Sequence, residues 1–170
     1  MKFYSIEILK ERVKKYKAYS LSSDLHTSIR RPNFPEDISE NIVKYFLDCE
    51  KITPGDLYSP LLGKIEVKCF SSKGPISFGP KETWDTLIVL DAISFLEDKY
   101  KLHIIRINSR DFNIKVNKNE TYKDQVFQKR RPRISWKSLY EQVKDQTKTF
   151  IILFANISTI GNVTEFPANL

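Results

Sequence analysis

The sequence predicts an α/β fold in which helices flank a mixed central β-sheet. Three observations support it: helical spacing of apolar residues near the start of the chain, short β-type segments in the middle, and both kinds of segment towards the end. With 170 residues the chain has the usual length of one compact domain. We therefore expect a single domain over residues 1–170.

Two helices are expected near the start of the chain. Apolar residues recur every three or four positions over residues 2–17, which predicts an amphipathic helix with Lys and Arg on its other face. Residues 20–34 are expected to form a loop. A second helix is expected over residues 37–48, and Asp37 and Glu40 have the spacing of a capping box at its start.

The middle of the chain is expected to contribute strands. Four of the five glycines and four of the eight prolines fall within residues 54–80, which predicts tight turns around one short strand. Residues 65–70 alternate between apolar and polar side chains, and this period places Glu66 and Lys68 on one face. The apolar run 87–90 is assigned to a strand, although a helix also fits it.

Strands and helices are mixed in the remainder of the chain. Four elements are expected there: strands over residues 102–107 and 149–155, the second of them buried, and helices over residues 121–128 and 135–143. Thr121 and Asp124 have capping-box spacing, and Ser135 is in position to cap the other helix.

The charge is unevenly distributed along the chain. Lys and Arg total 28 and Asp and Glu total 21, which gives a net charge of +7. Residues 1–31 contain eight basic and three acidic residues, residues 115–148 ten and four, and the intervening residues 32–114 ten and thirteen. An acidic segment between two basic ones suits a metal-dependent enzyme that acts on a polyanion, because carboxylates bind the metal and cations bind phosphates. Solvated surface charge is the alternative for each basic segment.

The composition excludes several kinds of site. Two cysteines are too few for a disulfide scaffold or a cysteine-rich zinc site, and two histidines leave little room for histidine-based metal chemistry. No secretory signal begins the sequence, and the longest apolar run, residues 150–155, is far shorter than the roughly 20 residues that cross a membrane. We therefore expect no membrane contact and a reducing, cytoplasmic location.

Asp56, Glu66 and Lys68 form the most informative constellation. If a strand that starts at Asp56 pairs as a hairpin with the strand 65–70, the three side chains converge. Two nearby carboxylates bind a hard divalent cation, which binds a phosphate oxygen and a water, and a lysine beside them can orient that water. The alternatives are that Asp56 only closes the Pro-Gly turn and that Glu66 and Lys68 only form an exposed strand face.

An Asp followed after a spacer by a strand that reads Glu-x-Lys resembles the PD-(D/E)xK nuclease superfamily. Gly55 separates the proline from the aspartate, which departs from the named pattern. Four further stretches are similar to small type II restriction endonucleases: residues 63–68 (GKIEVK), 74–80 (GPISFGP), Trp84-Asp85 and 130–134 (RRPRI). The resemblance covers roughly residues 38–140 and implies a restriction-endonuclease-like core.

The resemblance also implies an activity. It is Mg²⁺-dependent, sequence-specific hydrolysis of double-stranded DNA that leaves 5′-phosphates, carried out by a homodimer in a bacterium or a large DNA virus. Asp56 and Glu66 are then metal ligands and Lys68 is the catalytic lysine. A further glutamate from the preceding helix is Glu40, with Glu36 in reserve, although a capping role competes for Glu40.

Eight polar residues are expected to contact DNA, and they fall into two groups. The first follows the Glu-x-Lys strand and the second is an arginine cluster: Ser71, Ser72, Lys73, Ser77 and Lys81, then Arg130, Arg131 and Arg133. Hydroxyl groups and lysines suit phosphate contacts, and arginine can also read guanine through paired hydrogen bonds. An ordinary turn is the alternative for the first group, and structural anchoring is the alternative for the arginines.

Two other functions remain compatible with the sequence. A structure-selective or repair nuclease would keep the same fold and the same chemistry. A non-catalytic basic protein that binds DNA or RNA would have Asp56 and Glu66 as surface residues. Mg²⁺-dependent cleavage of a plasmid separates the nucleases from the binding protein, and discrete fragments indicate sequence specificity.

Overall fold

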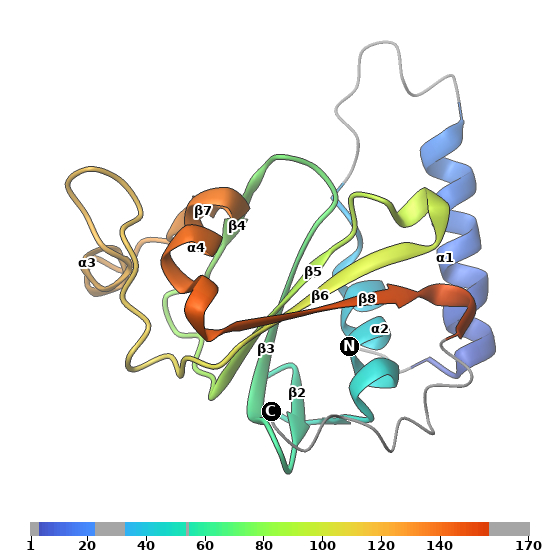
Figure 1. Ribbon diagram of the computed structural model, residues 1–170, viewed down its shortest axis with the longest axis horizontal. Coiled ribbons are helices and arrows are strands. Elements are labelled where there is room, and N and C mark those ends of the chain that lie inside the picture. Colours follow the sequence, from blue (N-terminus) through green and yellow to red (C-terminus); the bar gives the residue numbers. More distant parts are fainter. Residues whose placement is uncertain (1–3, 23–32, 54, 157–170) are drawn as a thin grey trace.

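A computed structural model describes residues 4–22, 33–53 and 55–156 of the chain. Its centre is a six-stranded sheet in the order β1-β2-β3-β5-β6-β8 (Figure 1). The strands are β1 (Glu50–Lys51), β2 (Leu57–Ser59), β3 (Gly63–Phe70), β5 (Thr86–Asp91), β6 (Lys99–Ile105) and β8 (Thr147–Leu153). β3 and β5 are parallel and all other neighbours in this sheet are antiparallel, so the expected mixed sheet is confirmed.

Two helices cover one face of this sheet, α1 (Ile6–Leu21) and α2 (Glu36–Leu47) (Figure 1). Their apolar sides pack with one face of the strands to form the larger core, which includes Leu9, Ile42 and Ile65, all fully buried. Helix α2 therefore lies directly over the part of the sheet that contains β3.

A smaller layer covers the other face of the sheet. It contains a separate two-stranded antiparallel sheet of β4 (Pro75–Ser77) and β7 (Arg133–Ser135), followed by α4 (Trp136–Val143), with α3 (Tyr122–Phe127) further out (Figure 1). Aromatic rings of Phe78, Trp84 and Phe112 pack against one another in its core. This packing holds the loop after β4 against the sheet. Three 3₁₀ turns complete the described elements: η2 (Phe95–Glu97), η3 (Lys144–Gln146) and η4 (Phe154–Asn156).

Several local expectations are confirmed. The apolar run 87–90 lies in strand β5, and it is continuous because both faces of the strand are buried there. Thr121 and Asp124 form the expected capping box of α3, and the Ser135 hydroxyl accepts a hydrogen bond from the backbone of Ser138 at the start of α4.

Other expectations need correction in their bounds. The first helix begins at Ile6 rather than residue 2, because Ser5 caps it, and it continues to Leu21. The strand expected over residues 102–107 is Lys99–Ile105. Of the expected loop at 20–34, residues 23–32 lie outside the described ranges.

Two expectations about strands, their number in residues 54–80 and the burial of the last strand, are wrong. Residues 54–80 contain three strands, β2, β3 and β4, instead of one short strand, and β3 alone has eight residues. Strand β8 is not buried, because it lies at the edge of the sheet, where the side chains of Ile151 and Leu153 are 62% and 48% exposed. Apolar composition cannot distinguish an edge strand from a central one.

Candidate active site

The β2–β3 hairpin positions Asp56. Leu57 lies opposite Ile65 in the antiparallel pair, so Asp56, one residue before β2, lies beside β3. Its Oδ2 atom accepts a hydrogen bond from the Val67 backbone N–H at 2.8 Å. Gly55 allows the chain to approach β2 in this way, because its φ of 125° is a backbone conformation that other residues rarely adopt. The hairpin expected from the sequence is therefore confirmed.

Glu66 and Lys68 point to the same side of β3, as the two-residue period of a strand requires. The Lys68 Nζ atom donates a hydrogen bond to Glu66 Oε1 at 2.6 Å. Both side chains are largely buried, with exposed fractions of 11% for Lys68 and 8% for Glu66. The interpretation of this pair as an exposed strand face is therefore wrong.

Glu40 reaches the same region from α2. Its side chain is buried, and its Oε2 atom has no hydrogen-bond partner in the described part of the chain. The expected capping box with Asp37 is absent, since the cap of α2 is Pro35 without a side-chain hydrogen bond. Asp37 instead accepts a hydrogen bond from the Tyr4 hydroxyl and pairs with Arg12 at 3.3 Å. Tertiary contacts with α1 have replaced the local cap.

These side chains line one pocket of about 510 Å³, which we call the carboxylate pocket. Its charged residues are the acidic Glu36, Glu40, Asp56, Glu66 and Glu82 and the basic Lys64, Lys68, Lys81 and Arg131. The structure thus brings together all four residues for which the sequence suggested catalysis.

Burial opposes the ionisation of the acidic side chains in the carboxylate pocket. It raises the pKa of Glu40 to about 8, and the nearby Asp56 adds to the shift. It also raises the pKa of Glu66 to about 7, against the effect of Lys68, and it raises the pKa of Asp56. Burial alone would lower the pKa of Lys68, but its neighbours Glu66 and Glu82 raise it. A cation bound here would offset the repulsion between these carboxylates.

The chemistry of these donors fits a hard divalent cation. All are carboxylate oxygens, and the buried Oε2 of Glu40 lacks a partner within residues 4–22, 33–53 and 55–156. Among the described residues, however, no three Asp, Glu, His or Cys side chains already form a metal-binding cluster. Glu66 is directed to Lys68 instead.

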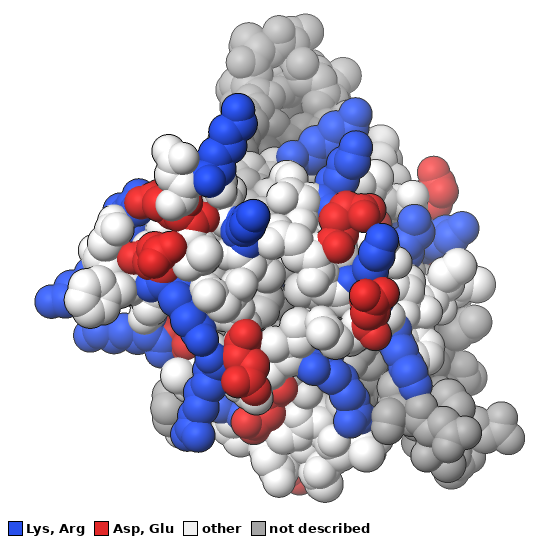
Figure 2. Space-filling view, turned by 60° about the vertical axis from the view of Figure 1, so that its left-hand side comes forward, with Lys and Arg blue, Asp and Glu red and all other residues white. Residues whose placement is uncertain are grey.

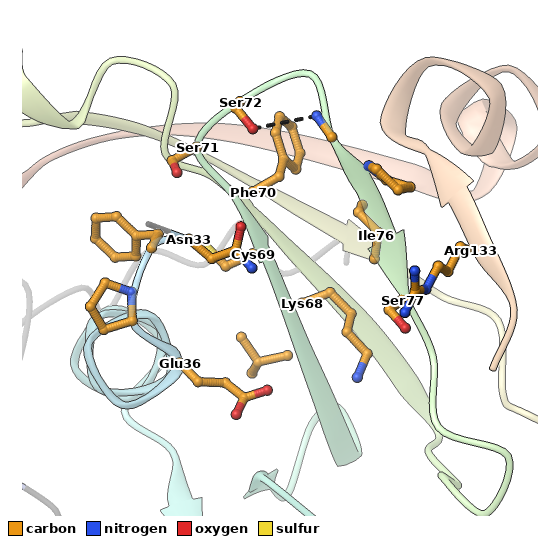
Figure 3. Close-up of a pocket in the computed structure, with 15 residues that line it drawn as sticks. Asn33, Glu36, Lys68, Cys69, Phe70, Ser71, Ser72, Ile76, Ser77 and Arg133 are labelled. Atoms are coloured by element: carbon orange, nitrogen blue, oxygen red, sulfur yellow. Dashed lines mark hydrogen bonds between the residues drawn. The ribbon is translucent and has the colours of Figure 1, made fainter. Parts of the chain in front are cut away.

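A second pocket of about 600 Å³, the serine pocket, adjoins the carboxylate pocket and shares Glu36 and Lys68 with it. Figure 3 shows Glu36 at the start of α2 on one wall and Ser77 and Arg133, from β4 and β7, on the opposite side. Four of the eight residues expected to contact DNA line this pocket: Ser71, Ser72, Ser77 and Arg133. The Ser72 hydroxyl accepts a hydrogen bond from the Gly74 backbone at 3.4 Å.

The other four residues expected to contact DNA are placed differently. Lys81 and Arg131 line the carboxylate pocket. Lys73 is exposed and lines neither of the two pockets. The Arg130 guanidinium pairs with Glu120, which anchors the loop before α3. The arginine cluster of the sequence is thus divided between a structural contact and the two pockets.

The sequence did not indicate that Glu82 belongs to the site. It lies in the loop after β4, and its Oε2 atom is 2.9 Å from Lys68 Nζ. Its only sequence signal is its position two residues after Gly79-Pro80, near the Glu-x-Lys strand. That signal is weak, because the contact depends on how the loop folds back over β3.

The fold also redistributes the charges that are segregated along the chain. Figure 2 shows basic and acidic side chains intermingled over one face of the molecule.

No helix in the described part of the chain is long and apolar enough to span a bilayer.

Comparison with known proteins identifies the family. Residues 2–143 match the Bsp6I restriction endonuclease family. The chain is 36% identical over 130 residues to the type II restriction enzyme Bsp6I of Bacillus sp. (strain RFL6), which covers 70% of this chain and 74% of that enzyme. No solved structure matches the chain. The resemblance to small type II restriction endonucleases is thereby confirmed, and the chain belongs to the Bsp6I restriction endonuclease family, with the activity of a sequence-specific endonuclease.

Proposed function

We propose that this endonuclease hydrolyses both strands of double-stranded DNA with Mg²⁺ in the carboxylate pocket and leaves 5′-phosphates. The observation that supports the proposal best is the convergence of Asp56, Glu66, Glu40 and Lys68 on that one pocket. Type II restriction enzymes generally need a divalent metal ion, and Mg²⁺ is the choice that an all-carboxylate donor set supports.

Each residue has a separate role in this proposal. Asp56 and Glu66 hold the ion, with Glu40 as a third carboxylate. The Val67 N–H fixes one Asp56 oxygen at 2.8 Å and leaves the other for the metal. Bound Mg²⁺ would polarise the scissile phosphate and make a bound water more acidic. Lys68 orients the attacking water and stabilises the charge that develops on the phosphate.

The products follow from which bond breaks. Water attacks phosphorus, the P–O3′ bond breaks, and the 3′ oxygen takes up a proton, so the phosphate stays on the 5′ end. The serine pocket is contiguous with the carboxylate pocket through Lys68, and it suits the phosphates that flank the scissile one. Ser71, Ser72, Ser77 and Arg133 are its proposed DNA contacts, while Lys73, Lys81, Arg130 and Arg131 are proposed contacts around it.

We further propose that the active form is a homodimer. Cleavage of both strands at a symmetric site is most simply achieved by two identical centres related by a two-fold axis. One chain supplies one set of the four proposed catalytic residues within its described part. A second chain would supply the other set.

Replacement of Asp56 tests the metal site. Asp56→Asn keeps the size of the side chain but removes its charge, so it should abolish plasmid cleavage with Mg²⁺. DNA affinity, measured with Ca²⁺ in place of Mg²⁺, should change little. The matched control is Asp145→Asn, which removes an exposed carboxylate of η3. Undiminished cutting by Asp56→Asn, or cutting by the wild type in excess EDTA, would contradict the proposal.

The ends of the fragments test the chemistry independently. Fragments with 5′-phosphates should ligate directly to a dephosphorylated vector. Ligation that occurs only after treatment with a polynucleotide kinase would show that the 3′ product carries the phosphate.

A further inference from the structure

Among the residues that the structure describes, Lys68 has two carboxylate partners, and only one of them belongs to the Glu-x-Lys motif. Its Nζ atom lies 2.6 Å from Glu66 Oε1 and 2.9 Å from Glu82 Oε2. The exposed fractions of the side chains are 11% for Lys68, 8% for Glu66 and 26% for Glu82. The ammonium group is therefore held between a strand carboxylate and a loop carboxylate, above the ring of Phe78 at 5.7 Å.

The two partners of Lys68 are not equivalent once a cation is bound. A divalent ion on Glu66 would neutralise much of the charge that attracts Lys68, and it would draw that carboxylate towards itself. A lysine side chain has a flexible four-carbon stem, so with Glu66 engaged it would lose its fixed position. Glu82 would then be the anion that keeps the ammonium group in place.

The loop is built to place the Glu82 carboxylate at this point. The Glu82 backbone N–H donates to the Gly79 carbonyl at 3.3 Å, which closes a turn with Pro80 in its second position. A Cβ atom on Gly79 would lie 2.6 Å from Glu82 Oε1, so a larger residue there would displace the carboxylate. Phe78 anchors the start of the turn, because its ring is fully buried.

We propose that Glu82 is a positioning residue, which holds the Lys68 ammonium group in its reactive place while Glu66 binds the metal. The proposal rests on the catalytic role proposed above for Lys68. It assigns Glu82 no direct contact with the DNA or with the metal. Pre-organisation of this kind raises the rate of the chemical step without changing how tightly the substrate binds.

The test compares three variants of the full-length enzyme in single-turnover cleavage with Mg²⁺. Glu82→Gln should lower the rate roughly 10- to 100-fold, which is the usual effect of a small displacement of a catalytic group. Glu82→Asp should recover part of that loss, because it restores the charge. Gly79→Ala should also lower the rate, since it moves the carboxylate without removing it. Glu97→Gln is the matched control, because it removes an exposed carboxylate of η2 and should not alter the rate.

Two further measurements exclude other roles of Glu82. The affinity of Glu82→Gln for Ca²⁺, measured by calorimetry, and its affinity for DNA should both equal those of the wild type. Its melting temperature should also stay close to that of the wild type. Weaker Ca²⁺ binding would make Glu82 a metal ligand, and a large fall in melting temperature would make it a structural residue; either result overturns the proposal.

Failure of this inference can be told apart from failure of the proposed function. If Lys68→Ala is inactive while Glu82→Gln and Gly79→Ala cut at the wild-type rate, only the role of Glu82 is refuted. If Lys68→Ala cuts at the wild-type rate, the proposed catalytic role of Lys68 is refuted, and with it the reason to position that side chain.

Discussion

At the scale of single residues, burial decides which charged groups are chemically unusual. Glu40, Glu66 and Lys68 are all removed from water, and the two carboxyl groups have raised pKa values of about 8 and about 7. Acidic residues outside the carboxylate pocket can behave differently. Glu120, for example, accepts hydrogen bonds from Asn117 and Gln125 and pairs with Arg130, and these contacts lower its pKa to about 2. The pKa of a glutamate is therefore shifted in opposite directions by desolvation in the carboxylate pocket and by hydrogen bonding at Glu120.

His103 shows the same effect in a residue outside the proposed site. It lies in β6, with Nδ1 2.8 Å from the Thr149 hydroxyl and its ring centroid 4.4 Å from that of Trp136. Burial lowers its pKa from 6.5 to about 4, with a smaller effect from Lys101. The unfolded chain therefore binds this proton at a higher pH than the folded chain. The stability that the neutral ring contributes is complete above pH 6.5 and is lost as the pH falls towards 4.

We predict that His103→Phe reduces this loss of stability in acid. Between pH 7 and pH 4 the wild type should lose up to about 3 kcal/mol more than the variant, since one pKa unit corresponds to about 1.4 kcal/mol. Phenylalanine removes the titrating ring and with it the Nδ1 contact to Thr149 at every pH, whereas Nε2 has no hydrogen-bond partner among the described residues. Urea unfolding at several pH values measures both proteins, and identical pH dependence of the two would show that His103 does not titrate as stated.

At the scale of elements, the β2–β3 hairpin is the unit that assembles the site. Its pairing places Asp56 beside Val67, between the two functional residues of β3. The backbone that enters the hairpin is strained for any residue other than glycine, because Gly55 has a φ of 125°. An added Cβ would also lie 2.7 Å from the side chain of Lys64.

We predict that Gly55→Ala lowers both stability and activity. The unfavourable φ should cost about 1–3 kcal/mol of the free energy of unfolding, measured in urea. Cleavage should fall further than this loss explains under conditions where the variant is still folded, because Asp56 is the next residue. Thr53→Ala, an exposed position in the same connection, is the control and should affect neither quantity. If Gly55→Ala cleaves DNA at the wild-type rate, the backbone before β2 can adopt a different φ at position 55 without displacing Asp56.

At the scale of the whole molecule, the site lies where the layers meet. Helix α2 contributes Glu40 from one face of the sheet, the hairpin contributes Asp56 and Glu66, and the loop after β4 contributes Glu82 from the other layer. The serine pocket continues between α2 and the β4–β7 sheet (Figure 3). A substrate that occupies both pockets would therefore contact three structural units that are far apart in the sequence.

Mixed dimers test the proposed assembly at this scale. After exchange of subunits, a dimer of one wild-type and one Lys68→Ala chain should nick one strand of a plasmid and leave the other intact. Wild-type dimers should linearise the plasmid and Lys68→Ala dimers should leave it supercoiled, which provides both controls. Cleavage of both strands by a chain shown to be monomeric on DNA would refute the homodimer.

The sequence by itself determined the features that depend on short-range geometry. The period of a strand puts Glu66 and Lys68 on one face, and the position of Asp56 after Gly55 indicated that it begins a hairpin. Local hydrogen bonding likewise made the caps at Thr121 and Ser135 predictable. The mixed α/β class followed from the order of these elements.

Only the tertiary structure decided the features that depend on packing between distant segments. Glu40 is buried in the pocket rather than used as a cap because α1 engages Asp37. Glu82 contacts Lys68 because the aromatic core under the loop after β4 fixes its path. Strand β8 is exposed because it comes last in the sheet order. Periodicity along the sequence indicates which side of a helix or strand is apolar. Which other helix or strand packs against that side depends on the free energy of the whole packed core.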